Sequence, residues 1–445
     1  ENLQIGSSYQ HWTLASFLVR ARWDYQGKYY ANIAIRTDGS SRLAAGNQWA
    51  FFPSGGVAWR ISEEKFFGKR EWLNSLKLRA SYGAVGNSAI DPYQTIAGLS
   101  KYDYLFGEDA SNKFFAYRPS MIPNKDLGWE ISRTANFGVD FGLWNNRISG
   151  YIEGYITKTS DLLMERTLPF FTGFSKVWQN IGKTENKGIE LNIQANTLKT
   201  KSFSWETTVT FARNWNKITE LLGGGDIRNN SWFIGKPLQV HYNYEMIGVW
   251  QLGEEKEAQK YGAIPGDIKV KDQNNDGSIG ELDKVILGQK DPKIIASLLN
   301  SFRFGAFDAS INLNMNFGSL IHPNTYASLI TRDGLRWMPS NFKYWTPDNP
   351  TNEYTRADKL SGYDPFAGTG GYMKGDYIKI QDITLGYDFS KIMPKNWKIL
   401  RARLYAQVRN LGYIYKACKN DVSPEAPDFD YNIPTTYTMG INIDF

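Results

Sequence analysis

The chain has 445 residues but only one cysteine, Cys418, and three histidines. A single cysteine excludes a disulfide within the chain and a metal site built from several thiolates. The sequence lacks any run of about 18 apolar residues, so it contains no candidate transmembrane helix. The net charge is only +6 and the basic residues are dispersed. This pattern argues against nucleic acid as a partner.

Catalytic motifs are also scarce. His11, His241 and His322 are far apart in the sequence, and none lies in a zinc-protease pattern. A G-x-S-x-G nucleophile motif is absent, and the sequence identifies no histidine partner for Cys418 as a nucleophile. We therefore expect neither enzymatic activity nor an organic cofactor.

The last eleven residues show what the sequence has instead, a strict alternation of apolar and polar side chains. The apolar members are Tyr437, Met439, Ile441, Ile443 and Phe445. Alternation over this length predicts a β-strand with two unlike faces. A soluble β-sandwich would show the same pattern. However, a strand of this length with a final aromatic residue is typical of the closing strand of a transmembrane β-barrel.

Similar alternation recurs along the chain and predicts thirteen strands. They lie at residues 16–25, 29–38, 52–61, 74–85, 130–142, 147–159, 185–196, 203–214, 293–304, 307–317, 376–389, 399–411 and 435–445. A slip in the alternation at Gln381 and Asp382 predicts a bulge in the eleventh strand. The prediction is an all-β protein, an antiparallel transmembrane β-barrel with apolar side chains facing lipid and polar side chains facing the lumen.

The connections between these strands alternate in length. Tight turns are predicted at residues 26–28, 144–146, 199–201 and 305–306, and long segments at 86–129, 160–184, 215–292, 318–375 and 412–434. Bacterial outer-membrane barrels have short periplasmic turns and long extracellular loops. Segment 239–251 is also strand-like, but another spanning strand would break this alternation, so we assign it to a folded outer loop. Since an odd number of strands does not close such a barrel, we expect residues 1–445 to be part of a larger one.

Several short motifs resemble the SusC/RagA-like family of TonB-dependent outer-membrane transporters. They are Asn-Lys-Gly-Ile-Glu at 186–190, the stretches at 36–41, 52–54 and 59–64, the stretch 265–269 leading into 272–277, and residues 378–387. Each motif is modest alone, but their order and spacing follow the family from about residue 16 to the end.

The resemblance implies a barrel of about 22 strands closed by a plug, of which this chain would be the C-terminal part, without the plug domain and the early strands. It also implies import of oligosaccharides or peptides across the cell outer membrane of a Gram-negative bacterium. The implied partners are a SusD-like lipoprotein on the extracellular face, the TonB complex acting through the plug, the glycan or peptide ligand, and membrane lipid.

The long loop 215–292 contains an acidic motif with the spacing of a calcium-binding loop. The candidate ligands are Asp272, Asn274, Asp276, the Ser278 carbonyl and Asp283. Position 12 of the motif is aspartate rather than the usual glutamate, which weakens the match. Asp, Asn and Gly also form ordinary turns, so the sequence leaves two interpretations open. Calcium is the only cofactor that the sequence suggests.

Aromatic residues in the outer loops are candidates for contact with the transported ligand, because flat aromatic faces bind sugars and peptides. They are Phe171, Phe174, Trp178, Trp232, Trp337 and Trp345. Packing within the loops or against a lipoprotein partner is the alternative. Arg401, Arg403 and Arg409 are predicted to face the lumen, where they would pair with plug carboxylates or guide a polar ligand.

Two other classes of protein share parts of this pattern. A passive porin would have the same strands and loops without a plug or a partner. A soluble calcium-dependent glycan-binding β-protein would explain the aromatic residues and the acidic loop, but it would bury its apolar strand faces against a second sheet.

Overall fold

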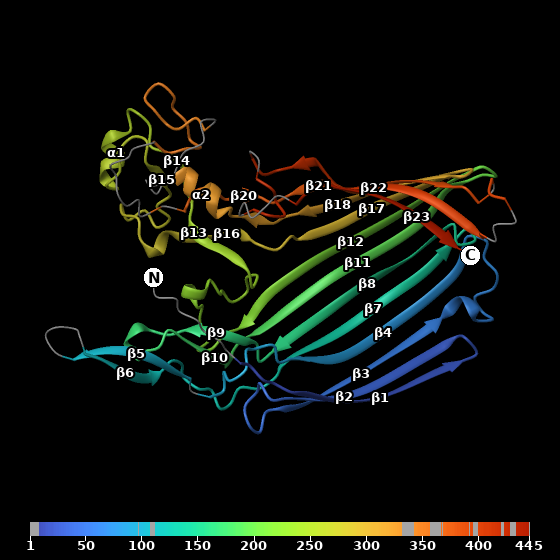
Figure 1. Cartoon of the computed structure of the whole chain (residues 1–445), viewed down its shortest axis with the longest axis horizontal. Helices are drawn as coiled ribbons and strands as arrows, with labels where there is room; N and C mark the ends of the chain where they lie inside the picture. The colour runs from blue at the N-terminus through green and yellow to red at the C-terminus, as the bar shows by residue number, and fades with distance from the viewer. Residues whose placement is uncertain are drawn as a thin grey trace. The chain divides into compact units, whose positions relative to one another are not determined.

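The computed structural model describes residues 9–96, 98–106, 112–331, 342–356, 366, 368–390, 392–394, 399–419, 422–427 and 433–444. In this part of the chain, all thirteen predicted strands form one sheet, hydrogen-bonded in their order along the chain (Figure 1). They are β1 (Leu14–Tyr25), β2 (Tyr29–Ser40), β3 (Trp49–Arg60), β4 (Leu73–Asn87), β7 (Glu130–Leu143), β8 (Ile148–Ser160), β11 (Lys183–Lys199), β12 (Phe203–Glu220), β17 (Ile294–Phe304), β18 (Phe307–Phe317), β21 (Tyr377–Asp388), β22 (Arg401–Lys416) and β23 (Thr436–Asp444). The all-β prediction is confirmed. None of the helices in the described ranges has the length and hydropathy needed to span a membrane.

The strand register separates an apolar face from a polar face. Met439 of β23 lies opposite Ala406 of β22, which lies opposite Leu385 of β21. One residue further along β22, Gln407 lies opposite Thr384 of β21, on the polar face. Met439 is 76% exposed, although a large apolar side chain is usually buried in a soluble protein. An exposed apolar side chain at every second position is what a lipid-facing wall requires.

Aromatic side chains gather on the apolar face where the strands end in tight turns. At the turn between β1 and β2, the rings of Tyr25 and Tyr29 stack at 6.4 Å. At the corresponding ends of β18 and β21, the rings of Phe307 and Tyr387 are in contact at 4.6 Å. Aromatic residues at the ends of spanning strands form the interfacial girdles of membrane barrels. The girdle therefore marks the turn ends of the strands as a membrane–water boundary.

Local conformation follows the predictions closely. Trp144, Asn145 and Asn146 form the turn between β7 and β8 with φ values of 49° to 58°, a left-handed conformation that asparagine tolerates better than most residues. The predicted bulge is present, because Asn312 and Leu313 of β18 lie opposite Asp382 and Ile380, which leaves Gln381 as the extra residue.

The long connections fold into small sheets and helices of their own. The two-stranded sheets pair β5 (Leu99–Phe106) with β6 (Asn112–Pro119), β9 (Leu163–Thr167) with β10 (Lys176–Asn180), β13 (Val240–Tyr244) with β16 (Lys284–Gln289), β14 (Met246–Val249) with β15 (Ile268–Val270), and β19 (Leu320–Ile321) with β20 (Met373–Lys374). The helices are α1 (Glu255–Lys260) and α2 (Asn324–Thr331), with 3-10 turns η1 (Ile61–Glu63), η2 (Phe170–Thr172), η3 (Arg228–Asn230) and η4 (Glu281–Asp283). Segment 239–251 forms β13 and β14 outside the large sheet, as predicted.

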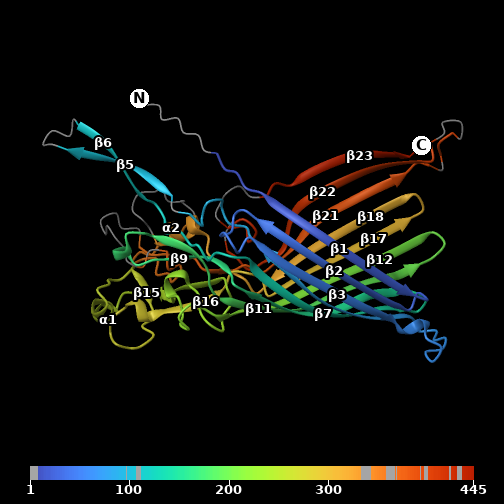
Figure 2. The same ribbon diagram turned by 90° about the horizontal axis from the view of Figure 1, so that it is seen from below.

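The chain divides into two compact units. Unit 1 comprises Glu1–Glu190 and Asn214–Leu238, and unit 2 comprises Leu191–Arg213 and Gln239–Phe445. The segment 215–292, predicted to be one long loop, is therefore divided between them. Within unit 2, β17, β18, β21, β22 and β23 lie side by side (Figure 2). Each unit has a loop core: Leu43, Phe52, Leu127 and Trp129 in unit 1, and Tyr326, Tyr354, Cys418 and Val422 in unit 2.

Candidate functional site

The polar face of unit 2 carries an ion pair between two strands. Nε of Arg403 on β22 donates to Oδ1 of Asp308 on β18 at 2.8 Å, and Nη2 donates to Oδ2 at 2.5 Å. This two-pronged geometry is the strongest form of a carboxylate–guanidinium contact. Arg401 lies 3.4 Å from Asp388, and Arg409 is exposed. Arg403 therefore has a partner in the wall itself, which the sequence did not reveal.

Amide side chains continue the polar face toward the loop ends of the strands. On β18, Nδ2 of Asn312 donates to Asp382, that of Asn314 to Oε1 of Gln381, and that of Asn316 to the Tyr377 hydroxyl, at 3.1, 3.2 and 2.8 Å. The bulge turns Gln381 to this face. The result is a continuous polar surface whose donors are already paired across strands.

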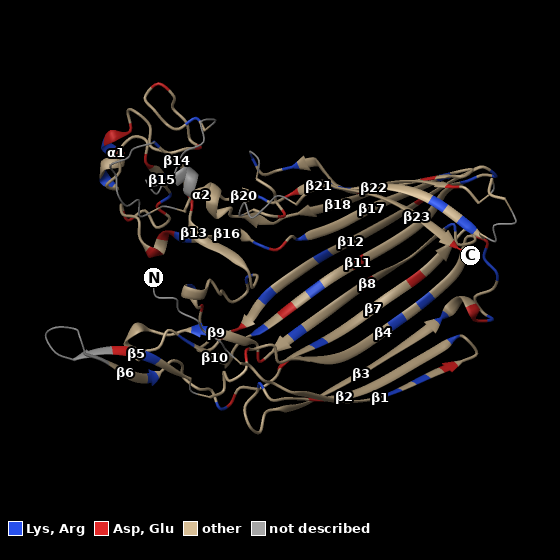
Figure 3. Cartoon of the chain, in the orientation of Figure 1, with Lys and Arg blue, Asp and Glu red and all other residues tan. Residues whose placement is uncertain are grey.

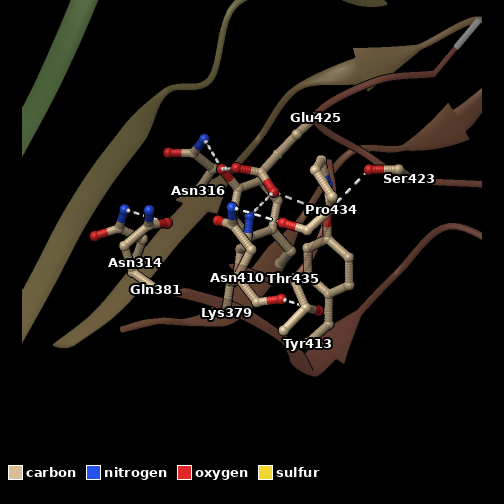
Figure 4. A network of polar contacts seen from close by, with 11 residues as sticks. Asn314, Asn316, Lys379, Gln381, Asn410, Tyr413, Ser423, Glu425, Pro434 and Thr435 are labelled. Carbon is tan, nitrogen blue, oxygen red and sulfur yellow. Dashed lines mark hydrogen bonds and ion pairs between the residues drawn. The ribbon is translucent and has the colours of Figure 1, made fainter. Parts of the chain in front are cut away.

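Glu425 closes the loop end of this surface from a separate segment, residues 422–427. Its Oε2 accepts from Nζ of Lys379 at 2.6 Å and from the Tyr413 hydroxyl at 2.8 Å, and Tyr377 approaches Oε1 at 3.4 Å (Figure 4). Lys379 is only 3% exposed. A buried ammonium requires a paired carboxylate, so Glu425 both neutralises Lys379 and fixes segment 422–427 against the wall.

Unit 1 has a polar wall of the same kind. Arg79 on β4 donates to Asp140 of β7 at 2.9 Å and contacts Glu153 of β8 at 2.5 Å. Lys77 lies 3.3 Å from the other Asp140 oxygen. Here every partner comes from a strand of the large sheet, Asp140 from the adjacent strand β7 and Glu153 from β8, one strand further.

The predicted ligand-contact aromatics occupy different environments. Phe170 and Phe171, in η2 at the tip of the β9–β10 hairpin, are 99% and 88% exposed. Phe174, Trp178 and Trp232 are half-buried, and Trp178 packs against the core of unit 1.

Trp345 differs from the others because it is 6% exposed and its indole N–H donates to Oε1 of Gln251 at 2.9 Å. Its ring packs within the loops of unit 2, so it has no face open to a ligand. Trp337 lies outside the described residues. Among the described members of the set, Phe171 is the most accessible, and its neighbour Phe170 is exposed as well.

The acidic loop is a compact turn. Asp272 Oδ2 accepts from the Gly277 amide at 2.9 Å, and Asn274 Oδ1 accepts from the Asp276 amide at 3.0 Å. Asp276 Oδ1 accepts from the Ser278 hydroxyl and amide, and these bonds lower the pKa of Asp276. The turn interpretation thus accounts for most of the motif's oxygens.

The hydrogen bonding of two of the candidate ligands, Asp283 and Asp272, bears on whether the loop could bind calcium. Asp283 is fully buried and accepts amides of Gln273 and Gly280 at 2.8 and 2.7 Å. Oδ1 of Asp272 is buried without a hydrogen-bond partner. Within the described residues, no three His, Cys, Asp or Glu side chains converge on a point that would hold a metal. The unpartnered oxygen fits a cation ligand, whereas the two occupied oxygens of Asp283 fit a structural role.

Sequence comparison identifies a matching family. Residues 3–411 match the family described as TonB dependent receptor-like, beta-barrel. The chain is 30% identical over 476 residues to TonB-dependent receptor P26 of Formosa agariphila, covering 99% of this chain and 47% of that protein. It is 29% identical to TonB-dependent receptor SusC of Bacteroides thetaiotaomicron, covering 97% of this chain and 44% of that protein. The chain therefore spans about half the length of the curated relatives it matches.

Comparison of structures agrees on the fold. The structure of the RagAB peptide transporter superposes with a TM-score of 0.79 at 24% identity, covering 98% of this chain and 48% of that one. At this level of identity the similarity establishes the barrel fold.

Proposed function

Because this chain belongs to the TonB-dependent receptor-like β-barrel family, we propose that it forms barrel wall in an outer-membrane importer of oligosaccharides, with peptides as the alternative cargo. A SusD-like lipoprotein would deliver the ligand to the extracellular loops. The TonB complex would supply the energy. The receptor family also supports the expectation that the protein is not an enzyme.

The paired polar wall is the observation that carries this proposal. Arg403 and Asp308 neutralise each other within the wall, and amides of the wall bond to one another. Such paired groups keep the surface hydrated while the charges of Arg403 and Asp308 cancel, which suits passage of a neutral polar ligand better than selection of an ion.

Uptake by cells tests the proposal directly. Cells that express the full-length protein and its neighbouring lipoprotein are supplied with labelled oligosaccharide and peptide mixtures, with TonB present or deleted. We expect oligosaccharide uptake that disappears without TonB. Uptake that persists without TonB would instead indicate a passive porin, and uptake of peptides alone would reverse the choice of cargo.

The exposed phenylalanines at the hairpin tip provide a second, finer test. Replacing Phe170 and Phe171 together by serine removes two aromatic side chains that are 99% and 88% exposed. We expect weaker capture of ligand or of the lipoprotein, measured separately by ligand titration and by co-purification. The matched control is Leu282→Ser, which removes another exposed apolar side chain from an extracellular loop. Equal effects of the two changes would remove the hairpin from the proposal.

Calcium binding by the acidic loop is a separate proposal, supported by the buried, unpartnered Oδ1 of Asp272. Asp272, Asn274, Asp276 and the Ser278 carbonyl would hold the ion and fix the loop, and Asp283 would organise the turn. The Tyr261 hydroxyl lies 3.3 Å from Asp272, so terbium luminescence sensitised by Tyr261 should report binding. Asp272→Asn should abolish the signal, and Glu257→Gln on α1 should leave it unchanged. Equal signals from both variants would identify the motif as an ordinary turn.

A further inference from the structure

Unit 1 has a groove of about 610 Å³ on its apolar face. Ala135 of β7 and Gly154 of β8 form its floor, and Phe137, Ile156, Ile189 and Trp215 border it. A side chain added at Gly154 would meet only the Gly188 carbonyl oxygen, at 3.8 Å, so the floor is open. Tyr155, the residue between Gly154 and Ile156, bonds to Asn214. Since successive residues of a strand point to opposite faces, the groove lies on the face away from that polar contact.

The groove residues lie on four strands, β7, β8, β11 and β12. Each of these strands also carries a basic residue, on the side of the groove where the strand ends in a long loop. On each strand, the basic residue lies two positions beyond a groove residue and therefore on the same face. These residues are Arg133 on β7, Lys158 on β8, Lys187 on β11 and Lys217 on β12. All four are exposed. Figure 3 shows Lys and Arg bands on these strands toward the ends that carry the long loops.

The charges of this basic rim are not balanced by protein groups. Glu185 lies 3.1 Å from Lys187 and 3.4 Å from Lys217, so one carboxylate serves two lysines. Arg133 and Lys158 are direct cross-strand partners, and like charges in that position repel. Among the described residues no acidic side chain is paired with either of them. An anion between Arg133 and Lys158 would remove the repulsion.

The location of the rim identifies the kind of anion. The apolar face of this outer-membrane barrel contacts lipid, and the rim lies at the extracellular ends of the strands, at the level of the outer-leaflet headgroups. A soluble anion would contact only the basic rim and would not fill the apolar groove below it. A lipid with an acyl chain and a phosphate satisfies both parts at once, because basic residues at a membrane surface attract anionic headgroups.

We propose that this groove and its basic rim bind a phosphorylated glycolipid of the outer leaflet. An acyl chain lies over Gly154 between Phe137 and Trp215, and a phosphate lies between Arg133 and Lys158. The site is independent of the transported cargo and of the TonB-dependent step, since it lies on the membrane face of the wall.

Lipid nanodiscs test the site. The full-length protein is reconstituted in phosphatidylcholine discs that contain a small fraction of lipid A or of phosphatidylglycerol, and the lipid retained after purification is measured by mass spectrometry. The variant Arg133→Gln with Lys158→Gln should retain about twenty-five-fold less lipid A, since each of the two basic residues near the surface contributes about a fivefold change. Lys199→Gln with Lys201→Gln, at the opposite end of β11, is the matched control and should retain lipid A fully.

Thermal unfolding gives a readout independent of retention. Lipid A should raise the midpoint of the wild-type protein but not of the Arg133→Gln, Lys158→Gln variant. In phosphatidylcholine alone, the variant should be the more stable protein because the repulsion between Arg133 and Lys158 is gone.

A Gly154→Leu change, which fills the groove, should reduce lipid A retention without altering charge. Equal retention by wild type and the double variant would overturn the proposal, as would equal retention of phosphatidylglycerol and lipid A.

Discussion

One charged residue in each unit, Arg79 in unit 1 and Lys379 in unit 2, is held in a different way. In unit 1, Arg79 of β4 is partnered by Asp140 of the adjacent strand β7 and by Glu153 of β8, the strand after it. In unit 2, Lys379 is partnered by Glu425, which comes from the connection between β22 and β23. The strand pairs are fixed by the register of the sheet, whereas the Lys379 pair exists only while segment 422–427 lies against the wall.

Burial makes this difference important. Arg79 is about one-third exposed, so water can replace a lost partner. Lys379 is almost fully buried, and a buried charge that loses its partner is strongly destabilising. His241 resembles Lys379, since its Nε2 bonds to the Leu320 carbonyl at 2.9 Å and its ring packs against Tyr372. Loop-dependent burial should therefore give larger effects than strand-to-strand pairing.

Removing the Glu425 charge should have the largest effect. Glu425→Gln leaves the Lys379 ammonium buried without a counter-ion, and we expect a loss of about 3 kcal/mol in the free energy of unfolding. Denaturant unfolding in detergent micelles measures it. The control is Glu353→Gln, which breaks an exposed pair with Lys419 and should cost less than about 1 kcal/mol. Adding Lys379→Met to Glu425→Gln should recover most of the loss. If Glu425→Gln and Glu353→Gln lose the same free energy of unfolding, burial of Lys379 under segment 422–427 does not add to the stability of the protein.

The same contrast explains what the sequence could predict. The strands were predictable because a lipid-facing wall requires an apolar residue at every second position, and even the bulge at Gln381 left a slip in that pattern. Strand ends were less accurate where the alternation lapses beyond the membrane: β11 begins at Lys183 and β22 continues to Lys416.

The ion-pair partner of a side chain was harder to predict than the face of the sheet on which the side chain lies. The sequence placed Arg403 on the polar face but did not identify Asp308, because 95 residues and a long loop separate them. Glu425 lies in a Ser-Pro-Glu-Ala-Pro stretch without periodicity, so no local signal pointed to it. The basic rim left a readable signal, a basic residue two positions beyond the apolar run on four strands. It becomes meaningful only when the topology brings those strands together.

His241 should make the stability of the unit 2 loops depend on pH. Burial, with smaller contributions from Lys290 and His322, lowers the pKa of His241 to about 4. The unfolded chain therefore binds the proton more readily, so this contribution is complete above pH ~6.5 and is lost as the pH falls toward ~4. We expect a loss of about 2 kcal/mol after allowing for partial exposure. His241→Gln keeps a donor for Leu320 without titrating. Unfolding of both proteins across this range should show the pH dependence in the wild type only, and identical profiles would assign it elsewhere.

Arg79 should show the smallest effect, because it is partly exposed and Asp140, one of its two partners, has a second cation in Lys77. In Arg79→Gln, Asp140 keeps Lys77 at 3.3 Å and only Glu153 loses its cation, so we expect a loss of about 1 kcal/mol. The loss should shrink as salt is added, since partly exposed pairs are screened. Arg79→Lys, which keeps the charge but only one of the two contacts, should fall between wild type and Arg79→Gln. A loss in Arg79→Gln as large as that in Glu425→Gln would mean that the register-fixed pairs, and not the loop, carry the electrostatic stability of the wall.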